Sequence, residues 1–359
     1  MNATTVAVDL AKSVFELAVA DDQWRVVHRA RLSRSQFERW FHNRAVSLVI
    51  MEACGSAHFW ARTLQARGIE VKLLPPRYVR AYVKRNKTDA ADAAALLEAA
   101  RCADIVPVQI KSVEQQALQS LHRVRSAWMA TRTARINILR GVCRELGIVI
   151  RAGSRAGVEQ ISQVLADPHS AVPTMLRDTL TLLLEEIRLY EARIAQLERQ
   201  LSAAAKASAA CATLLSVPGV GLLTATAMVA ATGGSVSHFK DARHFASWFG
   251  LTPKEYSSGG TRRLGRISKR GDRYLRMLLT HGARSVLRAA AVATRCSKPL
   301  DPLRQWGLAV QARSNHNKAT CALANKMARI CYATLRDHEP YERSKLTRKI
   351  ERRAFALPA

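Results

Sequence analysis

The sequence predicts an α/β layered domain followed by a mainly α-helical region, with a coiled coil as the connector. Three observations support this prediction. Strand and helix patterns alternate through the first hundred residues, apolar residues then recur in heptads over 176–201, and helical spacing broken by glycine-rich loops continues beyond residue 207. We divide the 359 residues into an α/β domain with a basic helical extension (1–147), a spacer and coiled coil (148–206), a mostly helical domain (207–335) and a charged tail (336–359).

The first domain begins with three short strands joined by polar turns, at 4–10, 14–19 and 24–27, which predict a meander. Helices and strands then alternate. The run Ser47–Met51 is apolar throughout, which is typical of a strand buried on both faces. The elements expected after the meander are a helix at 35–43, a strand at 47–51, a helix at 56–67, a strand at 70–74 and a helix at 89–101.

Two long helices are expected next. Residues 111–147 have helical spacing and are basic, so we expect them to contact nucleic acid through Arg123, Arg125, Arg132, Arg135, Arg140 and Arg144. After a poorly patterned stretch at 148–173, apolar residues recur in steps of four and three, as in a coiled-coil seam. This pattern favours a partner helix and self-association. The seam residues are Leu176, Leu180, Leu183, Ile187, Tyr190, Ile194, Leu197 and Leu201.

The charge balance indicates a polyanionic partner. Lys and Arg number 56 against 28 Asp and Glu, and the net charge of +28 favours DNA or RNA first and an acidic membrane surface second. No apolar stretch reaches the ~20 residues that a spanning helix needs, and residues 1–12 lack the basic start of a signal peptide. The seven cysteines are scattered without a Cys-x-x-Cys motif, which suits a reducing cytoplasm. We expect no membrane insertion.

Four carboxylates of the first domain stand out by position. Asp9 lies in an apolar strand, Glu52 ends the buried strand, and Asp89 and Asp92 are three residues apart on one helix face. Each alone has an ordinary explanation, as a turn residue, a helix cap or a solvated side chain. Together they suit a ribonuclease-H-like site for two divalent cations. Oxygen ligands without a His/Cys cluster indicate Mg²⁺ or Mn²⁺ rather than zinc.

Two glycine-containing turns stand out in the second half. Leu214–Gly221 looks like a helix-hairpin-helix turn, where Gly219 and Gly221 permit a tight backbone and helix amides can meet a phosphate. The string Ser257-Ser258-Gly259-Gly260 precedes a dense run of cations; its serines are either a nucleophile beside a phosphate clamp or ordinary loop residues. The cations expected to bind backbone phosphate include Arg262, Arg263, Arg266, Lys269, Arg270 and Arg273.

Five strings of the sequence occur in an order that resembles a known family. They are Val8-Asp9-Leu10-Ala11-Lys12, Met51-Glu52-Ala53-Cys54-Gly55, Lys87-Thr88-Asp89-Ala90-Ala91-Asp92-Ala93, Val217-Pro218-Gly219-Val220-Gly221, and Gly250-Leu251-Thr252-Pro253 followed by Ser258-Gly259. The chain resembles the DEDD-motif insertion-sequence transposases, which include the Piv/MooV invertases and the bridge-RNA-guided recombinases. The likeness extends from Asp9 to about Arg288.

The resemblance implies a RuvC-like ribonuclease-H domain whose acidic tetrad, Asp9, Glu52, Asp89 and Asp92, binds Mg²⁺ or Mn²⁺, and a second domain with Ser258 as nucleophile (Ser257 is the alternative). In such an enzyme the tetrad of one subunit acts with the serine of another, within a homodimer or homotetramer. The serine forms a covalent phosphoserine with DNA and releases a 3′-hydroxyl, and donor and target DNA then exchange strands.

Better characterised members of this family select both DNAs with a guide RNA encoded by the element, so the resemblance also implies an RNA partner and a place at the bacterial nucleoid. Lys12 and the turn with Gly219 and Gly221 are further expected nucleic-acid contacts. Two alternatives remain open. One is a RuvC-like nuclease that hydrolyses branched DNA with water, leaving Ser258 idle. The other is a non-catalytic nucleic-acid-binding assembly factor with a decayed metal site.

Overall fold

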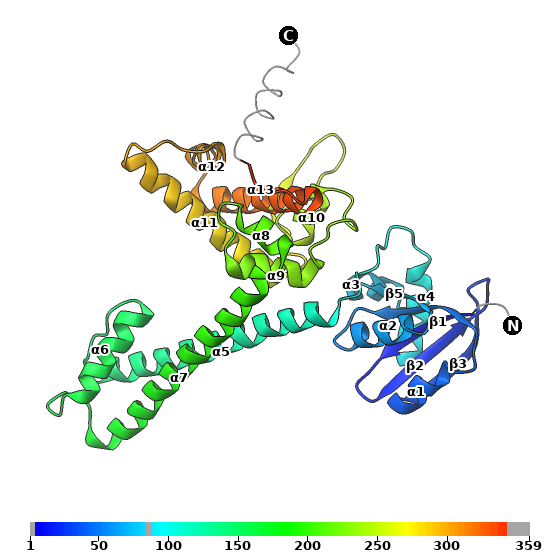
Figure 1. Cartoon of the computed structure of the whole chain (residues 1–359), viewed down its shortest axis with the longest axis horizontal. Helices are drawn as coiled ribbons and strands as arrows, with labels where there is room; N and C mark the ends of the chain where they lie inside the picture. The colour runs from blue at the N-terminus through cyan, green and yellow to red at the C-terminus, as the bar shows by residue number, and fades with distance from the viewer. Residues whose placement is uncertain (1–3, 84–87, 343–359) are drawn as a thin grey trace, which may run out of the picture. The chain divides into compact units, whose positions relative to one another are not determined.

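The computed structural model describes residues 4–83 and 88–342 and divides into two compact units, Met1–Val113 and Glu114–Ala359 (Figure 1). The predicted tail beyond residue 342 lies outside the described residues.

The first unit is built on one mixed five-stranded sheet with strand order β3-β2-β1-β4-β5. β1, β2 and β3 form an antiparallel meander, whereas β4 pairs parallel with both β1 and β5. This ribonuclease-H-like arrangement confirms the predicted α/β domain. Its elements are β1 (Thr4–Leu10), β2 (Val14–Ala20), β3 (Val26–Ser33), α1 (Arg34–Trp40), β4 (Val46–Glu52), α2 (Ala57–Gln65), β5 (Glu70–Leu74), α3 (Pro76–Val79), a 3₁₀ turn (Arg80–Tyr82) and α4 (Asp89–Ala100).

Helices cover both faces of this sheet because its central strands are apolar on both sides. One face packs on α1 and α2, where Phe15, Phe37 and Trp60 make edge-to-face ring contacts. The other face carries the small residues Ala7 and Ala18 and is covered by α4. Small residues let the alanine-rich helix lie close to the strands, and this close packing fixes where α4 begins relative to the sheet.

The second unit is mostly helical, as predicted. Its elements are α5 (Val113–Glu145), α6 (Ser154–Ala166), α7 (Thr174–Lys206), α8 (Ala209–Leu215), α9 (Leu222–Thr232), α10 (Ala242–Trp248), β6 (Pro253–Glu255), β7 (Leu264–Ile267), α11 (Arg273–Arg295), α12 (Pro302–Ala312) and α13 (His316–Asp337). The stretch 148–173, which has little pattern in the sequence, contains α6. No helix in the described part of the chain combines the length and the apolar character that crossing a membrane requires.

Apolar heptad residues of α7 pack against other helices of the same chain. Leu180 and Ile187 are buried against α5 and α6 in one apolar cluster. Three ion pairs flank the contact between α5 and α7: Arg125–Glu198 at 2.7 Å, Arg132–Glu191 at 3.5 Å and Arg135–Glu186 at 2.7 Å. The seam therefore has partner helices within its own chain, whereas self-association of the chain remains a prediction.

Candidate functional site

Asp9 and Glu52 end neighbouring parallel strands of the first unit. Val8 of β1 pairs with Met51 of β4, and Asp9 and Glu52 are the next residues along the two parallel strands. Side chains alternate between the faces of a strand, and Ala7 and Ile50, two residues earlier, lie in the layer that α4 covers. Asp9 and Glu52 therefore share the face covered by α4, where both are half-buried.

Asp92 belongs to α4 itself. Thr88 caps this helix with its side-chain oxygen, which fixes the first turn. Asp92 lies one helical turn before Leu96, which is buried against the sheet, so both are on the same side of α4. Arg29 of β3 donates a hydrogen bond of 2.9 Å to the Ala90 carbonyl and ties this turn to the sheet.

Asp89 is the first residue of α4, and its side chain lies outside the described part of the structure. The predicted tetrad thus comes from two adjacent strand ends and from the first turns of the helix above them. Carboxylate oxygens fit a hard cation such as Mg²⁺. Among the described side chains, no three His, Cys, Asp or Glu residues are grouped closely enough to hold a metal ion.

A further carboxylate, Glu16, lies in this row of the sheet. It pairs with Asp9 across β1 and β2, and Arg31 of β3 pairs with it in turn. Glu16 and Arg31 therefore lie in line with Asp9 on the face that α4 covers. The sequence signal for Glu16 is one acidic residue within the apolar run 14–20, the same kind of signal that singles out Asp9.

Ser258 lies near the tip of the β6–β7 hairpin in the second unit. Its backbone N–H donates to the Thr261 carbonyl (3.3 Å), and its carbonyl accepts from the Thr261 N–H (3.2 Å), which closes a tight turn at Gly259-Gly260. Gly259 has φ +55°, a conformation that glycine adopts readily. All residues from 253 to 266 are exposed. The hairpin thus presents the serine to solvent.

The two candidate serines differ in their hydroxyl contacts. Ser257 Oγ donates to Glu255 Oε1 (2.7 Å) and accepts from the Arg263 N–H (3.2 Å). The bond from Ser257, together with Arg262 at 3.3 Å, lowers the pKa of Glu255. Within the described residues the Ser258 hydroxyl makes no hydrogen bond. Ser257 is therefore engaged in holding the hairpin, and the Ser258 oxygen is accessible.

The base of the hairpin is held by close backbone packing. Gly250 has φ +69°, and a Cβ there would collide with the backbone of Arg270; a Cβ on Gly271, at φ +78°, would collide with the Trp248 carbonyl. Arg276 crosses this contact and donates to the carbonyls of Phe249 (2.9 Å) and Arg270 (3.2 Å). Glycine at these positions lets the two ends of the hairpin lie against each other.

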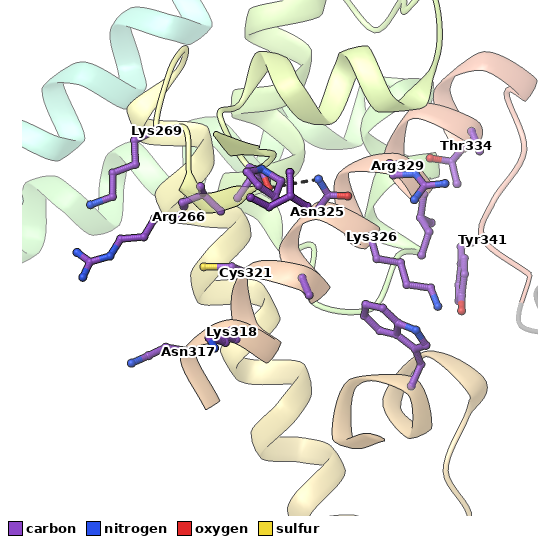
Figure 2. A pocket seen from close by; sticks show the side chains of 18 of the residues that line it. Arg266, Lys269, Asn317, Lys318, Cys321, Asn325, Lys326, Arg329, Thr334 and Tyr341 are labelled. Atoms are coloured by element: carbon purple, nitrogen blue, oxygen red, sulfur yellow. Dashed lines mark hydrogen bonds between the residues drawn. The ribbon is translucent and has the colours of Figure 1, made fainter. Parts of the chain in front are cut away.

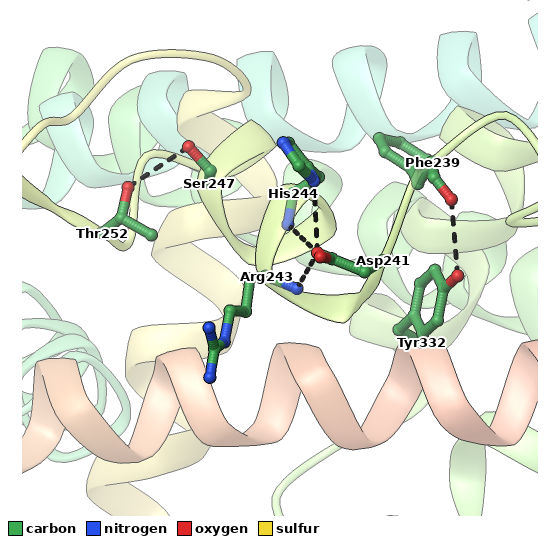
Figure 3. A network of polar contacts seen from close by, with 7 residues as sticks. All are labelled: Phe239, Asp241, Arg243, His244, Ser247, Thr252 and Tyr332. Atoms are coloured by element: carbon green, nitrogen blue, oxygen red, sulfur yellow. Dashed lines mark hydrogen bonds and ion pairs between the residues drawn. The ribbon is translucent and has the colours of Figure 1, made fainter.

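The helix that leads into the hairpin is fixed by its own cap (Figure 3). Asp241 Oδ1 accepts from the backbone N–H groups of Arg243 (2.7 Å) and His244 (2.8 Å), and these bonds lower the pKa of Asp241. At the other end of α10, Thr252 Oγ1 donates to Ser247 Oγ at 3.2 Å. The Gly-Leu-Thr-Pro string therefore leaves a rigid helix and enters the hairpin in a defined direction.

The predicted phosphate-binding cations have different surroundings. Arg262 pairs with Glu255. Lys12 is exposed in the turn between β1 and β2. The remaining members of the predicted set are exposed on the second unit and available to a polyanion: Arg263, Arg266, Lys269, Arg270 and Arg273.

Half of the six arginines of α5 that were expected to contact nucleic acid form ion pairs within the chain. Of the six arginines expected to contact nucleic acid, Arg125, Arg132 and Arg135 pair with glutamates of α7. Arg140 donates to backbone carbonyls of the chain after α5. Arg123 and Arg144 are exposed, so the surface that α5 offers to phosphate is smaller than its sequence predicts.

The Pro-Gly-x-Gly turn connects α8 and α9. Gly219 has φ +83°, and a Cβ there would meet Met327, Val286 and the Gly282 carbonyl within 2.7–2.8 Å. Close packing of the turn against helices α11 and α13 is therefore enough to explain the glycine at this position, without a bound phosphate. Gly221 is exposed as the N-cap of α9, with no heavy atom near a Cβ. Phosphate binding at the turn remains a prediction.

Two family models match the sequence. A DEDD-type IS110 model, described as "Transposase", covers residues 6–147, and a model described as "Transposase IS116/IS110/IS902 family" covers residues 211–296. The first match includes the four carboxylates and the second includes the serine hairpin.

Curated relatives are similar over nearly the whole chain. A "Probable family 20 transposase" of Pseudomonas aeruginosa is 44% identical over 93% of this chain and 97% of its own. The "Transposase for insertion sequence element IS1111A" of Coxiella burnetii is 38% identical over 94% of this chain and 90% of its own. The "Transposase for insertion sequence element IS1328" of Yersinia enterocolitica is 33% identical over 92% of this chain and 96% of its own.

Proposed function

The chain belongs to the IS116/IS110/IS902 family of insertion-sequence transposases, and from this premise we propose that it transfers DNA strands through a covalent bond to Ser258. Transposases are DNA phosphoryl-transfer enzymes. The observation that best supports the proposal is the hairpin: an exposed, rigidly based turn presents Ser258, and the hydroxyl of its neighbour is held by Glu255. A nucleophile must reach a bulky phosphodiester, and an exposed tip allows this approach.

In the proposed step the Ser258 oxygen attacks the DNA phosphorus. The new O–P bond forms as the bond to the 3′-oxygen breaks; the serine hydroxyl loses its proton, and the 3′-oxygen gains one. The phosphodiester energy is retained in the phosphoserine, so a 3′-hydroxyl can reverse the step on another strand without ATP. The exposed cations around the hairpin, Arg263 and Arg266 among them, would hold the flanking phosphates.

We assign Asp9, Glu52, Asp89 and Asp92 as the residues that would hold Mg²⁺ or Mn²⁺. When bound, such a cation offsets charge at the reacting phosphate. The adjacent positions of Asp9 and Glu52, on the sheet face that α4 covers, support this assignment. Glu16 and Arg31, in line with Asp9, are expected to orient these carboxylates.

The carboxylates belong to the first unit and the serine to the second. We propose that the tetrad of one subunit acts with Ser258 of another in a homodimer or homotetramer. An exposed hairpin supports this arrangement, because it can enter the site of a second copy. Because Leu180 and Ile187 of the α7 seam pack on α5 and α6, we propose that self-association uses a further surface of the chain.

The proposed substrates are a donor and a target DNA, and the proposed third partner is a guide RNA encoded by the element. A net charge of +28 on 359 residues supports a large polyanionic cargo. For such a protein we propose a location in the cytoplasm, at the nucleoid.

The test is covalent trapping. The full chain is incubated with element RNA, Mg²⁺ and end-labelled cognate DNA, then denatured and run on a gel beside Ser258→Ala, Ser257→Ala and Asp9→Asn. We expect a labelled protein band that Ser258→Ala abolishes, Ser257→Ala retains at reduced level, and Asp9→Asn reduces at least tenfold. Cleaved DNA without a covalent band, still dependent on Asp9, would instead establish the hydrolytic nuclease.

A further inference from the structure

A long groove runs along α13 in the second unit, at a place that the sequence motifs do not mark. The cavity has a volume of about 1780 Å³, and its walls come from α12, α13, the β7 arm of the hairpin and the chain after α13 (Figure 2). Lining residues on α13 extend from His316 to Asp337, and at the rise of an α-helix they span about 32 Å. That length suits an extended chain of several units rather than a small molecule.

Cations line most of this groove. Lys318, Lys326 and Arg329 lie on α13, and Arg266 and Lys269 come from the hairpin arm and the residues after it (Figure 2). Within the described residues, the three α13 cations make no ion pair. The acidic lining residues gather at the other end, around Asp337 and beyond. Positive charge is therefore concentrated in the half of the groove nearest the hairpin.

Two cationic side chains, Lys326 and Arg329, lie close together in the middle of the groove. Burial, together with the charge of Arg329, lowers the pKa of Lys326. The Lys326 ammonium lies 4.1 Å from the centroid of the half-buried Trp306 ring, which is a cation–π contact. A polyanion in the groove would relieve the repulsion between the two cations.

The floor of the groove is apolar and aromatic. Trp306 of α12 lines it together with Ile330, Ala322 and Leu251. Phosphate-binding cations beside an aromatic platform are the combination that binds unpaired nucleic acid, because exposed bases stack on rings while the backbone follows the charges. The bases of a duplex are already stacked on each other and cannot use such a floor.

We propose that this groove binds an unpaired nucleic-acid strand, with phosphates on Lys318, Lys326 and Arg329. Lys326 would move from the Trp306 ring to a phosphate, and a base would take its place on the ring. The inference rests on the proposed function in one respect: strand transfer produces unpaired DNA, and a guide RNA would supply unpaired RNA. The cationic half of the groove includes Arg266, on the arm of the hairpin that carries Ser258. A strand lying in the groove is therefore led toward the nucleophile.

The test uses the full chain with Ser258→Ala as background, so that no covalent product forms. Binding is measured by fluorescence anisotropy with an unpaired 15-nucleotide DNA, the RNA of the same sequence, and the DNA duplex, over a range of salt concentrations. The variants are Lys326→Gln/Arg329→Gln and Trp306→Leu. The matched control is Lys298→Gln/Arg313→Gln, which removes two exposed cations that do not line the groove.

We expect the groove double variant to weaken binding of the unpaired strand and to reduce its salt slope by about 1.4, roughly 0.7 for each lost phosphate contact. Trp306→Leu should weaken the same strand about tenfold, the effect of losing one stacked base. Duplex binding should be unchanged by either variant, and the control should leave all three ligands unaffected. The tighter of the two unpaired strands identifies whether the groove serves DNA or RNA.

Unchanged affinity for both unpaired strands in the groove variants, with melting temperatures equal to that of the parent, would overturn the proposal. So would an equal loss for duplex and unpaired strands. Neither result would contradict the proposed covalent bond at Ser258, because covalent trapping is measured separately on protein with the serine intact. The two proposals therefore fail independently.

Discussion

At the scale of single residues, function and stability depend on which polar groups have partners. Ser257 and Ser258 are adjacent and chemically identical, yet the first is bound to Glu255 and the Arg263 amide and the second presents its hydroxyl to solvent. A hydroxyl that already holds a hairpin together must give up those bonds before it can attack. This difference favours Ser258 on physical grounds that are independent of family resemblance.

His122 shows the same principle in the core of the second unit. It is 3% exposed, with Nε2 3.0 Å from Thr226 Oγ1 and Nδ1 3.1 Å from the Tyr274 hydroxyl. Thr226 donates its own proton to the Leu222 carbonyl at 2.7 Å, so it accepts from His122 Nε2–H. Burial, and then the charge of Arg125, lower the pKa of His122 to about 4, so at neutral pH the ring is neutral and its Nδ1 accepts from Tyr274.

We predict a pH-dependent stability term from this histidine. Its pKa is below the unfolded value of 6.5, so the unfolded chain binds the extra proton first as the pH falls. The contribution is fully present above pH 6.5 and is lost progressively toward pH 4, by up to about 3 kcal/mol. Urea unfolding at pH 7.5 and 4.5 should show a larger loss for the parent than for His122→Gln. Equal losses would contradict a neutral buried ring.

At the scale of elements, packing decides which local patterns carry function. The turn between α8 and α9 has the glycines of a phosphate-binding turn, but Gly219 is required where its backbone meets Gly282 of α11 and Met327 of α13. The arginines of α5 have the spacing of a nucleic-acid-binding helix, but half of them face glutamates of α7. In both cases a neighbouring element accounts for residues that sequence analysis assigns to a ligand.

Serine substitutions at the two glycines of this turn should separate their roles. Gly219→Ser places a Cβ within 3 Å of three neighbours at φ +83°, and it should destabilise the protein by about 2–4 kcal/mol. Gly221→Ser adds a favourable N-cap residue in open space and should change stability by less than about 1 kcal/mol. Melting temperatures compare the two. A Gly219→Ser protein as stable as the parent would mean that the turn is not held by α11 and α13.

At the scale of the whole molecule, the residues proposed for catalysis are divided between two compact units. The carboxylates belong to the unit ending at Val113, and the serine hairpin belongs to the unit that follows. Such a division permits a site assembled from two copies of the chain. The groove along α13 and the Ser258 hairpin belong to one unit, so the proposed strand binding and the proposed attack would be positioned together.

Mixing two inactive variants should test assembly between copies. Asp9→Asn keeps the serine and Ser258→Ala keeps the carboxylates, so neither forms a complete site alone. Co-expressed in equal amounts, they should recover about a quarter of the parental covalent product, because half of random dimers are mixed and each contains one complete site. A single chain carrying both substitutions, co-expressed with the parental chain, controls for dilution of active copies. No recovery in the mixture would place tetrad and serine in the same subunit.

The sequence by itself predicted the main strands and helices of the first unit, the meander, the helical second unit and the strand-end positions of Asp9 and Glu52, because these follow from short-range periodicity; it did not predict α6 or the β6–β7 hairpin. The tetrad and Ser258 as catalytic groups remain predictions that the positions of the described residues support. Only the tertiary structure decided that α7 pairs with α5 of its own chain, that Glu16 lies in line with Asp9, and that α12, α13 and the hairpin enclose a groove. The physical reason is that periodicity fixes which face of an element is apolar, whereas the partner of that face depends on long-range packing that no local pattern encodes.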